Sequence, residues 1–470
     1  MIKTRWAVKA CSLALCLCLA GCSTAPDIPQ PTLDELLAEV NAAHQTVNQP
    51  QLDASQYVTR PAPDEETLDY FTSDLTKFEF DPDAEVTAAQ AAEDVEYLFG
   101  AFRSLYGPYD YFGGDETFGE HKAELLAKLK EKESWTATEV KDLLLEGLRF
   151  FKDGHFSINN GERPNPWQVP FFYREVAFYK TEEGDYISEK GKRVASVDGY
   201  SDLDELFKRS ISPEGEIVYY PILLKEYEPQ AGDETLIVHY TNGSTQTLTA
   251  EPFQRYNERI EGDAVTEYHK DGEIPVFTID SCYDGVMDEI TAGAIMVARY
   301  PVGIVDIRAN MGGSDSVSET WLRQYTYTNH QMFRNQFLMN VFSGLSGYED
   351  GWVENDRVLV VLTSKNVASA AETFVDMAHN VENVLFIGEN TWGAQVTSAA
   401  YHVWLPNSKC VVTMGHGLFE VPQDWDYYQE LRGYEPDLWV PAGEAEELAV
   451  KLMENLGAVQ AEGEAASPAA

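Results

Sequence analysis

The chain has 470 residues, of which 44% are hydrophobic and 24% are charged, and this composition excludes collagen-like, low-complexity and fully disordered proteins. At roughly 150 residues per domain, the length predicts about three domains. The chain carries 78 acidic and 34 basic residues, a formal net charge of −44. Because so acidic a surface repels phosphate backbones, the charge argues against nucleic acid as a partner.

The first residues have the pattern of a secretory signal. A basic start precedes a short apolar run over residues 11–20, which is too short for a permanent bilayer-spanning helix. The run ends in LAGC, residues 19–22, which resembles the lipobox of bacterial lipoproteins. That resemblance implies a signal peptide over 1–21, acyl chains on Cys22, and a protein held on the extracytoplasmic face of the cell membrane. Plain secretion without a lipid is the alternative.

Two cysteines remain after the predicted signal peptide and Cys22 are set aside, namely Cys282 and Cys410. They could pair outside the cell, but a single pair so far apart in sequence makes no disulfide framework. We therefore expect two buried small hydrophobic residues. The sequence holds no CxxC or HExxH spacing, so no zinc site is predicted.

The N-terminal half divides by composition. Residues 22–33 are polar and proline-rich and predict a tether, and residues 34–165 predict a helical region. Within it, Thr136 and Glu139 form a capping-box pattern at the start of a helix that ends near Gly154. Residues 166–260 change to short β-like runs separated by turns.

One stretch of this β-rich segment, GKRVASVDG at residues 191–199, resembles the strand and turn of a PDZ module. A generic β-rich insert is the alternative. If the segment is PDZ-like, an extended peptide could add to its strand edge.

Residues 261–456 alternate between apolar strands and helices. Such near-continuous apolar runs followed by helices predict a layered α/β core with buried strands. The runs are IPVFTID, VGIVDIRA, RVLVVLTS and VLFIGEN, and the intervening helices include DEITAGAIMVARY and SAAETFVDMAHN. Residues 457–470 are small and acidic and predict a disordered tail.

The strand within VDIRANMGG, residues 305–313, ends in the pair Gly312 and Gly313. Glycines at a strand end leave backbone N–H groups approachable, which suits a site that binds an oxyanion. A Gly-Gly turn that only closes a strand–helix connection is the alternative.

Ser369, in the stretch NVASAAE, follows a buried strand and opens an amphipathic helix. One interpretation is a helix N-cap, with Glu372 completing the capping box. The other is a nucleophile at a helix N-terminus, where the N–H of Ala370 can donate to an oxyanion.

His155, in KDGHFS, stands where a helix ends and a strand begins. A lone histidine is usually structural. At the end of an element, however, its imidazole could point away from the fold, and that position suits a general base.

These three stretches, with ELRGYEPD at residues 430–437, resemble motifs of the C-terminal-processing (tail-specific) and tricorn-core serine peptidases. The resemblance covers most of 90–160 and 270–450. It implies a crotonase/ClpP-like layered α/β core and a serine-type endopeptidase of the C-terminal-processing kind, with a peptide or protein substrate and no metal or cofactor. Ser369 would be the nucleophile, and the N–H groups of Ala370 and of Gly312 or Gly313 would form the oxyanion hole.

The chain departs from both branches of this family. Ala394 stands where the processing proteases have their lysine base, which leaves His155 as the base and Glu430 as the carboxylate that orients it. Gly154 stands where the tricorn arrangement has a serine. The link from Glu430 to His155 could therefore be direct or run through Ser157, Asp153 or water, and the rival carboxylates are Glu435 and Asp426.

The resulting hypothesis is a lipid-anchored extracytoplasmic serine peptidase. A catalytically silent relative that binds peptides or envelope components is the first alternative, motivated by the missing lysine and by Gly154. An unrelated lipoprotein of solute-binding or structural type is the second, because an alternating strand–helix pattern fits many functions.

Overall fold

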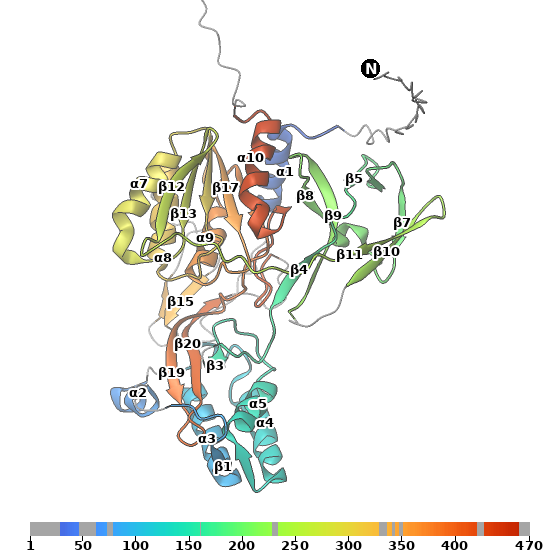
Figure 1. Cartoon of the computed structure of the whole chain (residues 1–470). Helices are drawn as coiled ribbons and strands as arrows, with labels where there is room; N and C mark the ends of the chain where they lie inside the picture. Colours follow the sequence, from blue (N-terminus) through green and yellow to red (C-terminus); the bar gives the residue numbers. More distant parts are fainter. Residues whose placement is uncertain are drawn as a thin grey trace, which may run out of the picture.

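The computed structural model describes residues 29–46, 63–72, 79–159, 161–227, 234–328, 336–340, 344–346, 351–420 and 427–459 (Figure 1). The predicted signal peptide, Cys22, Asp426 and most of the predicted tail lie outside these residues. The fold is mixed α/β, as the sequence predicts. No helix in the described part of the chain combines the length and apolarity that a membrane crossing requires.

A layered core contains the buried strands that the sequence predicts. Its strands run parallel from β13 to β21, and β12 pairs antiparallel at one edge. Each of the four apolar runs forms a strand because both faces of this sheet are covered. In sheet order the strands are β12 (Thr266–Asp271), β13 (Ile274–Ile279), β14 (Val302–Asp306), β17 (Val358–Thr363), β18 (Val384–Gly388) and β21 (Leu438–Trp439).

Helices cover both faces of this sheet (Figure 1). Alternate residues of one strand point to opposite faces, so Val361 packs with one helix layer and Val360 with the other. The first layer holds η5 (Asp284–Val286), α7 (Met287–Val297), α8 (Asp315–Thr326) and α9 (Ala370–Ala378). The second holds α1 (Leu33–Gln45), η6 (Ala442–Glu444) and α10 (Ala445–Asn455).

The β-rich segment continues the core sheet. Strand β8 pairs with β21 at Ser210 and Trp439, and the Ser210 hydroxyl donates to the Trp439 carbonyl at 2.5 Å. The PDZ-like stretch forms β7 and a turn in which Gly199 has φ +83°. The elements are β4 (Gln168–Phe172), β5 (Phe178–Lys180), β6 (Tyr186–Ser188), β7 (Val194–Val197), α6 (Leu203–Leu206), β8 (Phe207–Ile211), β9 (Ile217–Glu226), β10 (Thr235–Tyr240) and β11 (Thr245–Thr249).

A helical lobe carries the histidine motif. Its elements are α2 (Glu65–Thr72), β1 (Glu85–Thr87), α3 (Ala88–Leu105), η3 (Gly107–Tyr109), α4 (Gly114–Lys128), η4 (Leu129–Glu131), β2 (Ser134–Thr136), α5 (Ala137–Gly147) and β3 (Ser157–Ile158). The capping box predicted for Thr136 and Glu139 is confirmed at the start of α5, but the predicted end near Gly154 is wrong, because α5 ends at Gly147. Helix α1 belongs elsewhere: its Asn41 side chain donates a hydrogen bond at 2.9 Å to the side chain of Asn383, the residue before β18 of the core sheet. The predicted 34–165 region is therefore divided in space.

A long hairpin joins the lobe to the core. Strands β19 (Thr397–Trp404) and β20 (Val411–Glu420) leave the core and reach the helices (Figure 1), with β15 (Gln336–Asn340) and β16 (Gly344–Ser346) in the same sheet. The hairpin residues Val403 and Val412 belong to the apolar cluster of the lobe. Cys410 is buried there and Cys282 is buried in the core; both are free thiols, as expected.

Candidate active site

Ser369 occupies a strained turn between β17 and α9. Its φ of 55° and ψ of −127° lie in a region that non-glycine residues rarely adopt. The turn is held from both sides, because the Ala368 N–H donates to the Asn310 carbonyl at 3.3 Å and the Ser364 hydroxyl donates to the Arg308 carbonyl at 2.6 Å. A sharp strand-to-helix turn of this kind exposes a serine hydroxyl at a sheet edge.

Both interpretations of Ser369 fit the turn. It is the residue before the first turn of α9, and its N–H donates to the Glu372 carboxylate at 3.3 Å. Glu372 is buried, which raises its pKa, and it also accepts from the N–H groups of Gly393 and Ala394 at 2.7 Å each. The N-cap position thus ties the serine to the loop around Ala394.

The Gly-Gly pair lies directly against this turn. A Cβ added at Gly312 would lie 2.7 Å from the Ser369 Cβ and 3.1 Å from the Ala370 nitrogen. The Gly312 N–H donates to the Asn310 side chain at 2.9 Å. The N–H groups of Gly313 and Ala370 have no acceptor among the described residues. Of the predicted donors, these two remain for an oxyanion.

His155 lies between α5 and β3 and is half-buried. Its backbone N–H donates to Asp153 at 2.9 Å, whereas its Nδ1 is buried without a hydrogen-bond partner in the described part of the chain. Asp153 also accepts from Tyr106 and Thr397, so it fixes the backbone of the histidine and not the ring. Burial lowers the pKa of His155, while the charge of Asp153 opposes that shift.

Glu430 contacts the histidine segment through the main chain. One carboxylate oxygen accepts from the Gly154 N–H at 2.6 Å, and the other accepts from the N–H groups of Gln395 and Val396 and from the Tyr428 hydroxyl. Burial raises the pKa of Glu430 to about 8. Through its hydrogen bond to the Gly154 N–H, the Glu430 side chain holds the residue before His155.

The remaining residues that the sequence offered for orienting His155 make other contacts or lie outside the described residues. Glu435 forms ion pairs with Lys208 and Arg432, and Asp426 lies outside the described residues. Ser157 pairs with Thr413 in the β3–β20 ladder.

The two halves of the predicted site meet at Gly393 and Ala394. A Cβ added at Gly154 would lie 2.4 Å from the Gly393 carbonyl oxygen and 2.7 Å from the Ala394 Cβ. Ala394 in turn packs in one apolar cluster with Ala368, the neighbour of Ser369. The segments that carry the imidazole and the hydroxyl, far apart in sequence, are thus joined by one short loop.

Comparison with known proteins places part of the chain in a family. Residues 287–440 match the model of peptidase family S41. Residues 287–440 form a peptidase family S41 domain. The serine-peptidase resemblance predicted from the sequence is therefore confirmed, and it covers Ser369, both glycines and Glu430, whereas His155 lies outside the matched residues. No curated protein matches the sequence significantly.

Solved structures with similarity to the chain include three peptidases. Mature CPAF is 13% identical with a TM-score of 0.43, and the match covers 80% of this chain and 99% of that one. The photosystem II D1 C-terminal processing protease is 13% identical with a TM-score of 0.37, covering 78% and 97%. The tricorn protease is 12% identical with a TM-score of 0.35, covering 79% and 37%. Since all three TM-scores are below 0.5, the assignment depends on the family match.

The S41 domain contains one buried group that the sequence analysis missed. The Lys365 ammonium lies within 2.7–3.3 Å of four carbonyl oxygens, which belong to Thr391, Trp392, Leu431 and Arg432. Burial lowers its pKa to about 7. The lysine ties the loop before Ala394 to the segment after Glu430. A lysine four residues before the candidate nucleophile, in an otherwise small and apolar stretch, was the available signal.

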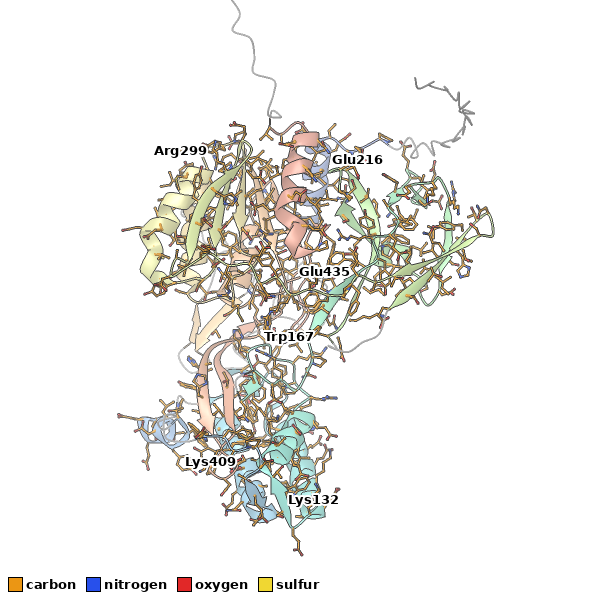
Figure 2. The ribbon with its side chains drawn as sticks, viewed as in Figure 1. Lys132, Trp167, Glu216, Arg299, Lys409 and Glu435 are labelled. Carbon is orange, nitrogen blue, oxygen red and sulfur yellow. The ribbon has the colours of Figure 1, made fainter. Side chains whose placement is uncertain are left out.

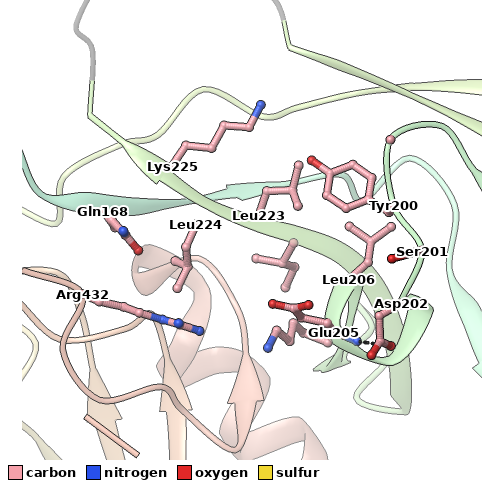
Figure 3. Close-up of a pocket in the computed structure, with 13 residues that line it drawn as sticks. Gln168, Tyr200, Ser201, Asp202, Glu205, Leu206, Leu223, Leu224, Lys225 and Arg432 are labelled. Atoms are coloured by element: carbon pink, nitrogen blue, oxygen red, sulfur yellow. Dashed lines mark hydrogen bonds between the residues drawn. The ribbon is translucent and has the colours of Figure 1, made fainter. Parts of the chain in front are cut away.

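A separate pocket of about 400 Å³ lies between the β-rich part and Arg432 (Figure 3). Apolar side chains, including Leu206, Ile222 and Leu224, line it together with Lys208. None of the predicted catalytic residues is among its lining residues, so this pocket is distinct from the S41 active-site candidate.

Proposed function

We propose that the protein is a serine endopeptidase of the C-terminal-processing type in which Ser369 is the nucleophile and His155 is the base. One observation carries the proposal: Ser369 stands in a strained strand-to-helix turn beside two backbone N–H groups, of Ala370 and Gly313, that have no acceptor among the described residues. Such an arrangement suits attack on a carbonyl whose oxygen becomes an anion.

The proposed reaction has two matching halves. The Ser369 oxygen attacks the peptide carbonyl carbon while His155 takes the hydroxyl proton, and the former carbonyl oxygen becomes the oxyanion. The carbon–nitrogen bond then breaks, and His155 returns the proton to the leaving amine. Water attacks the acyl-enzyme with the same proton transfers and releases the acid. Each oxyanion donor contributes about 3–4 kcal/mol in comparable sites.

The charge state of His155 fits the role of a general base. Because burial lowers the pKa of its imidazole, the ring stays neutral and able to accept a proton near neutral pH. Since Nδ1 is enclosed, Nε2 is the nitrogen proposed to exchange the proton. Glu430 is proposed as a positioning residue that acts through the backbone of Gly154.

The silent-relative hypothesis stays the second candidate because of one observation. His155 Nδ1 has no partner among the described residues, so no hydrogen bond fixes the tautomer of the ring. In such a protein, the site would bind a peptide without cleaving it.

An active-serine probe separates these candidates. A fluorophosphonate should label the wild-type protein and the control Ser201→Ala, whose serine is exposed in the β-rich part, but not Ser369→Ala. Peptide hydrolysis should disappear in both Ser369→Ala and His155→Ala. Absence of labelling in a folded protein that still binds peptides would favour the silent relative. Absence of both labelling and peptide binding would favour the unrelated lipoprotein.

We also propose a lipid anchor at Cys22 on the extracytoplasmic face of a bacterial cell membrane. The LAGC stretch supports it, and buried methylenes contribute about 0.8 kcal/mol each, so several acyl chains hold a soluble domain firmly. In a bacterial host, a radioactive fatty acid should be incorporated into the wild-type protein and not into Cys22→Ser. Equal incorporation into both proteins, or into neither, contradicts the anchor.

A further inference from the structure

Two arginines lie over the same pair of tryptophans. The ring centroids of Trp167 and Trp392 are 3.9 Å apart. The Arg163 guanidinium lies 5.3 Å and 5.0 Å from these two rings, and the Arg255 guanidinium lies 5.7 Å and 5.4 Å from them. The two guanidinium groups thus contact the same aromatic pair. Because like charges repel, each destabilises the charged form of the other.

This arginine pair, Arg163 and Arg255, borders both halves of the proposed site. Arg163 Nε donates to the Gly154 carbonyl at 3.1 Å, next to the proposed base. Arg255 Nε donates to the Asn366 side chain at 2.6 Å, three residues before the proposed nucleophile. Trp392 also packs with the alanine that precedes Ser369. Figure 2 labels Trp167 at the junction of the helical lobe and the layered core.

No carboxylate of the described residues comes within ion-pair distance of either arginine. Arg163 and Arg255 differ in this from Arg174, which pairs with Glu251 and Glu444, and from the buried Arg308. Burial lowers the pKa of Arg163 and the charge of Asp153 opposes that larger effect, but four other donors occupy the oxygens of Asp153.

The sequence neighbour of Arg163 does not compensate its charge either. Glu162 accepts from Lys141 Nζ at 2.5 Å. Arg163 Nη1 also donates to the Gly161 carbonyl at 2.9 Å, so Nη2 is the nitrogen of Arg163 that remains for a ligand. Arg255 is exposed and Arg163 is half-buried, so neither is closed off from a ligand. Their guanidinium groups present planar donors that match a carboxylate, and the tryptophan rings shield one side from water.

We propose that Arg163 and Arg255 form a carboxylate-binding subsite beside Ser369, which selects substrate peptides that carry an Asp or Glu side chain near the scissile bond. This inference rests on the proposed function for its place in catalysis. A bound carboxylate would relieve the repulsion between the two cations. The acidic remainder of the surface repels such peptides, so binding concentrates at this point.

Peptide binding to Ser369→Ala tests the subsite without depending on turnover. The probes are acetylated and amidated alanine hexapeptides that carry one Glu or one Gln at each position in turn. The change in tryptophan fluorescence of the protein measures their binding. We expect at least one Glu peptide to bind about tenfold more tightly than its Gln counterpart, with the difference shrinking at high salt. Equal binding of every Glu and Gln pair, or no binding up to millimolar peptide, overturns the subsite.

Arginine variants in the same background assign the effect. Arg255→Gln and Arg163→Gln should each remove most of the Glu preference, and Arg163→Lys should keep part of it. The control Arg299→Gln removes an exposed arginine that lies far from Trp167 (Figure 2) and should keep the full preference. A preference that survives the double variant Arg163→Gln/Arg255→Gln contradicts the proposal.

Two further measurements distinguish a side-chain carboxylate from a C-terminal one, and the proposed subsite from the proposed peptidase activity. A Gln hexapeptide with a free C-terminus tests whether the carboxylate comes from the chain end; if only that peptide gains affinity, the side-chain assignment is wrong. The fluorophosphonate probe on the wild-type protein reports on Ser369 independently. Labelling without any Glu preference leaves the peptidase standing and removes the subsite, whereas a Glu preference without labelling or hydrolysis removes the peptidase and keeps the binding site.

Discussion

Gly154 packs directly against Ala394: a Cβ added at residue 154 would lie 2.7 Å from the Ala394 Cβ and 2.4 Å from the Gly393 carbonyl oxygen. These two residues are the positions at which the chain departs from the resembled peptidases. Their contact gives a common physical reason, because a serine at 154 or a lysine at 394 would occupy space that the other segment fills. The small residues allow the histidine segment to approach the nucleophile turn.

Replacing Gly154 should therefore be costly. We expect Gly154→Ser to reduce stability by about 1–3 kcal/mol through overpacking and to lower peptidase activity. Urea unfolding and peptide hydrolysis measure both effects. Gly119→Ala is the control, since a Cβ there meets no atom within 4 Å and the residue is exposed in α4. It should be neutral or slightly stabilising; equal effects of the two variants would mean that the contact with Ala394 is unimportant.

The strain at Ser369 predicts an unusual order of stabilities. Glycine adopts φ 55°, ψ −127° more easily than alanine, so Ser369→Gly should be more stable than Ser369→Ala by about 1 kcal/mol. Thermal unfolding of the two inactive variants measures the difference. At Ser201, whose φ is not positive, alanine should be at least as stable as glycine. The same order at both positions would contradict strain at Ser369.

Lys365 should be essential to the architecture of the site. Lys365→Met removes the ammonium from all four carbonyl oxygens. The Leu431 oxygen keeps the Gln168 N–H, and the Thr391 and Arg432 oxygens keep the Asn390 side chain, whereas the Trp392 oxygen keeps no donor among the described residues. We expect a loss of about 1–3 kcal/mol in the free energy of unfolding. Lys130→Met, at an exposed lysine, should change stability by less than about 0.5 kcal/mol. Denaturant titration compares them, and a Lys365→Met protein with wild-type stability would show that other donors satisfy these carbonyls.

Glu389 predicts a pH dependence of stability. Burial raises its pKa to about 7, and its Oε2 has no partner among the described residues. From about pH 4.3 to 7 the unfolded chain releases this proton while the folded chain retains it, so stability falls as pH rises through that range. The stabilising contribution of protonated Glu389 is therefore fully present below about pH 4.3 and is lost above about pH 7.

Glu389→Gln stays neutral throughout and should flatten the pH dependence by up to roughly 3 kcal/mol between pH 4.3 and 7. Urea unfolding at a series of pH values measures the slope. The same slope in the variant and the wild-type protein would show that Glu389 is ionised in the folded state at pH 5.

The proposed base predicts the acidic limb of the activity profile. Because burial lowers the pKa of His155, the neutral ring should persist below the ordinary value of about 6.5. We expect kcat/KM to begin its acidic decline only below that pH. Hydrolysis of one peptide between pH 4 and 9 gives the profile. A decline centred above pH 6.5 would contradict a buried imidazole as the base.

Local patterns anticipated a large part of the fold. The capping box at Thr136 and Glu139 depends on residues three positions apart, and the buried strands are continuous apolar runs. By contrast, helix α8 and the β19–β20 hairpin were not predicted. The hairpin is stabilised by packing on the distant α3 region, where Asp94 accepts the Asn407 and Ser408 N–H groups.

The sequence by itself determined the serine at a strand-to-helix turn, the Gly-Gly strand end and the resemblance to serine peptidases, because each depends on short motifs of neighbouring residues. Only the tertiary structure decided that Glu430 binds the Gly154 N–H, that Gly154 packs against Ala394, and that two arginines share one tryptophan pair. These contacts join segments far apart in the chain, and which segments meet depends on how the whole chain buries its apolar surface and satisfies its hydrogen bonds.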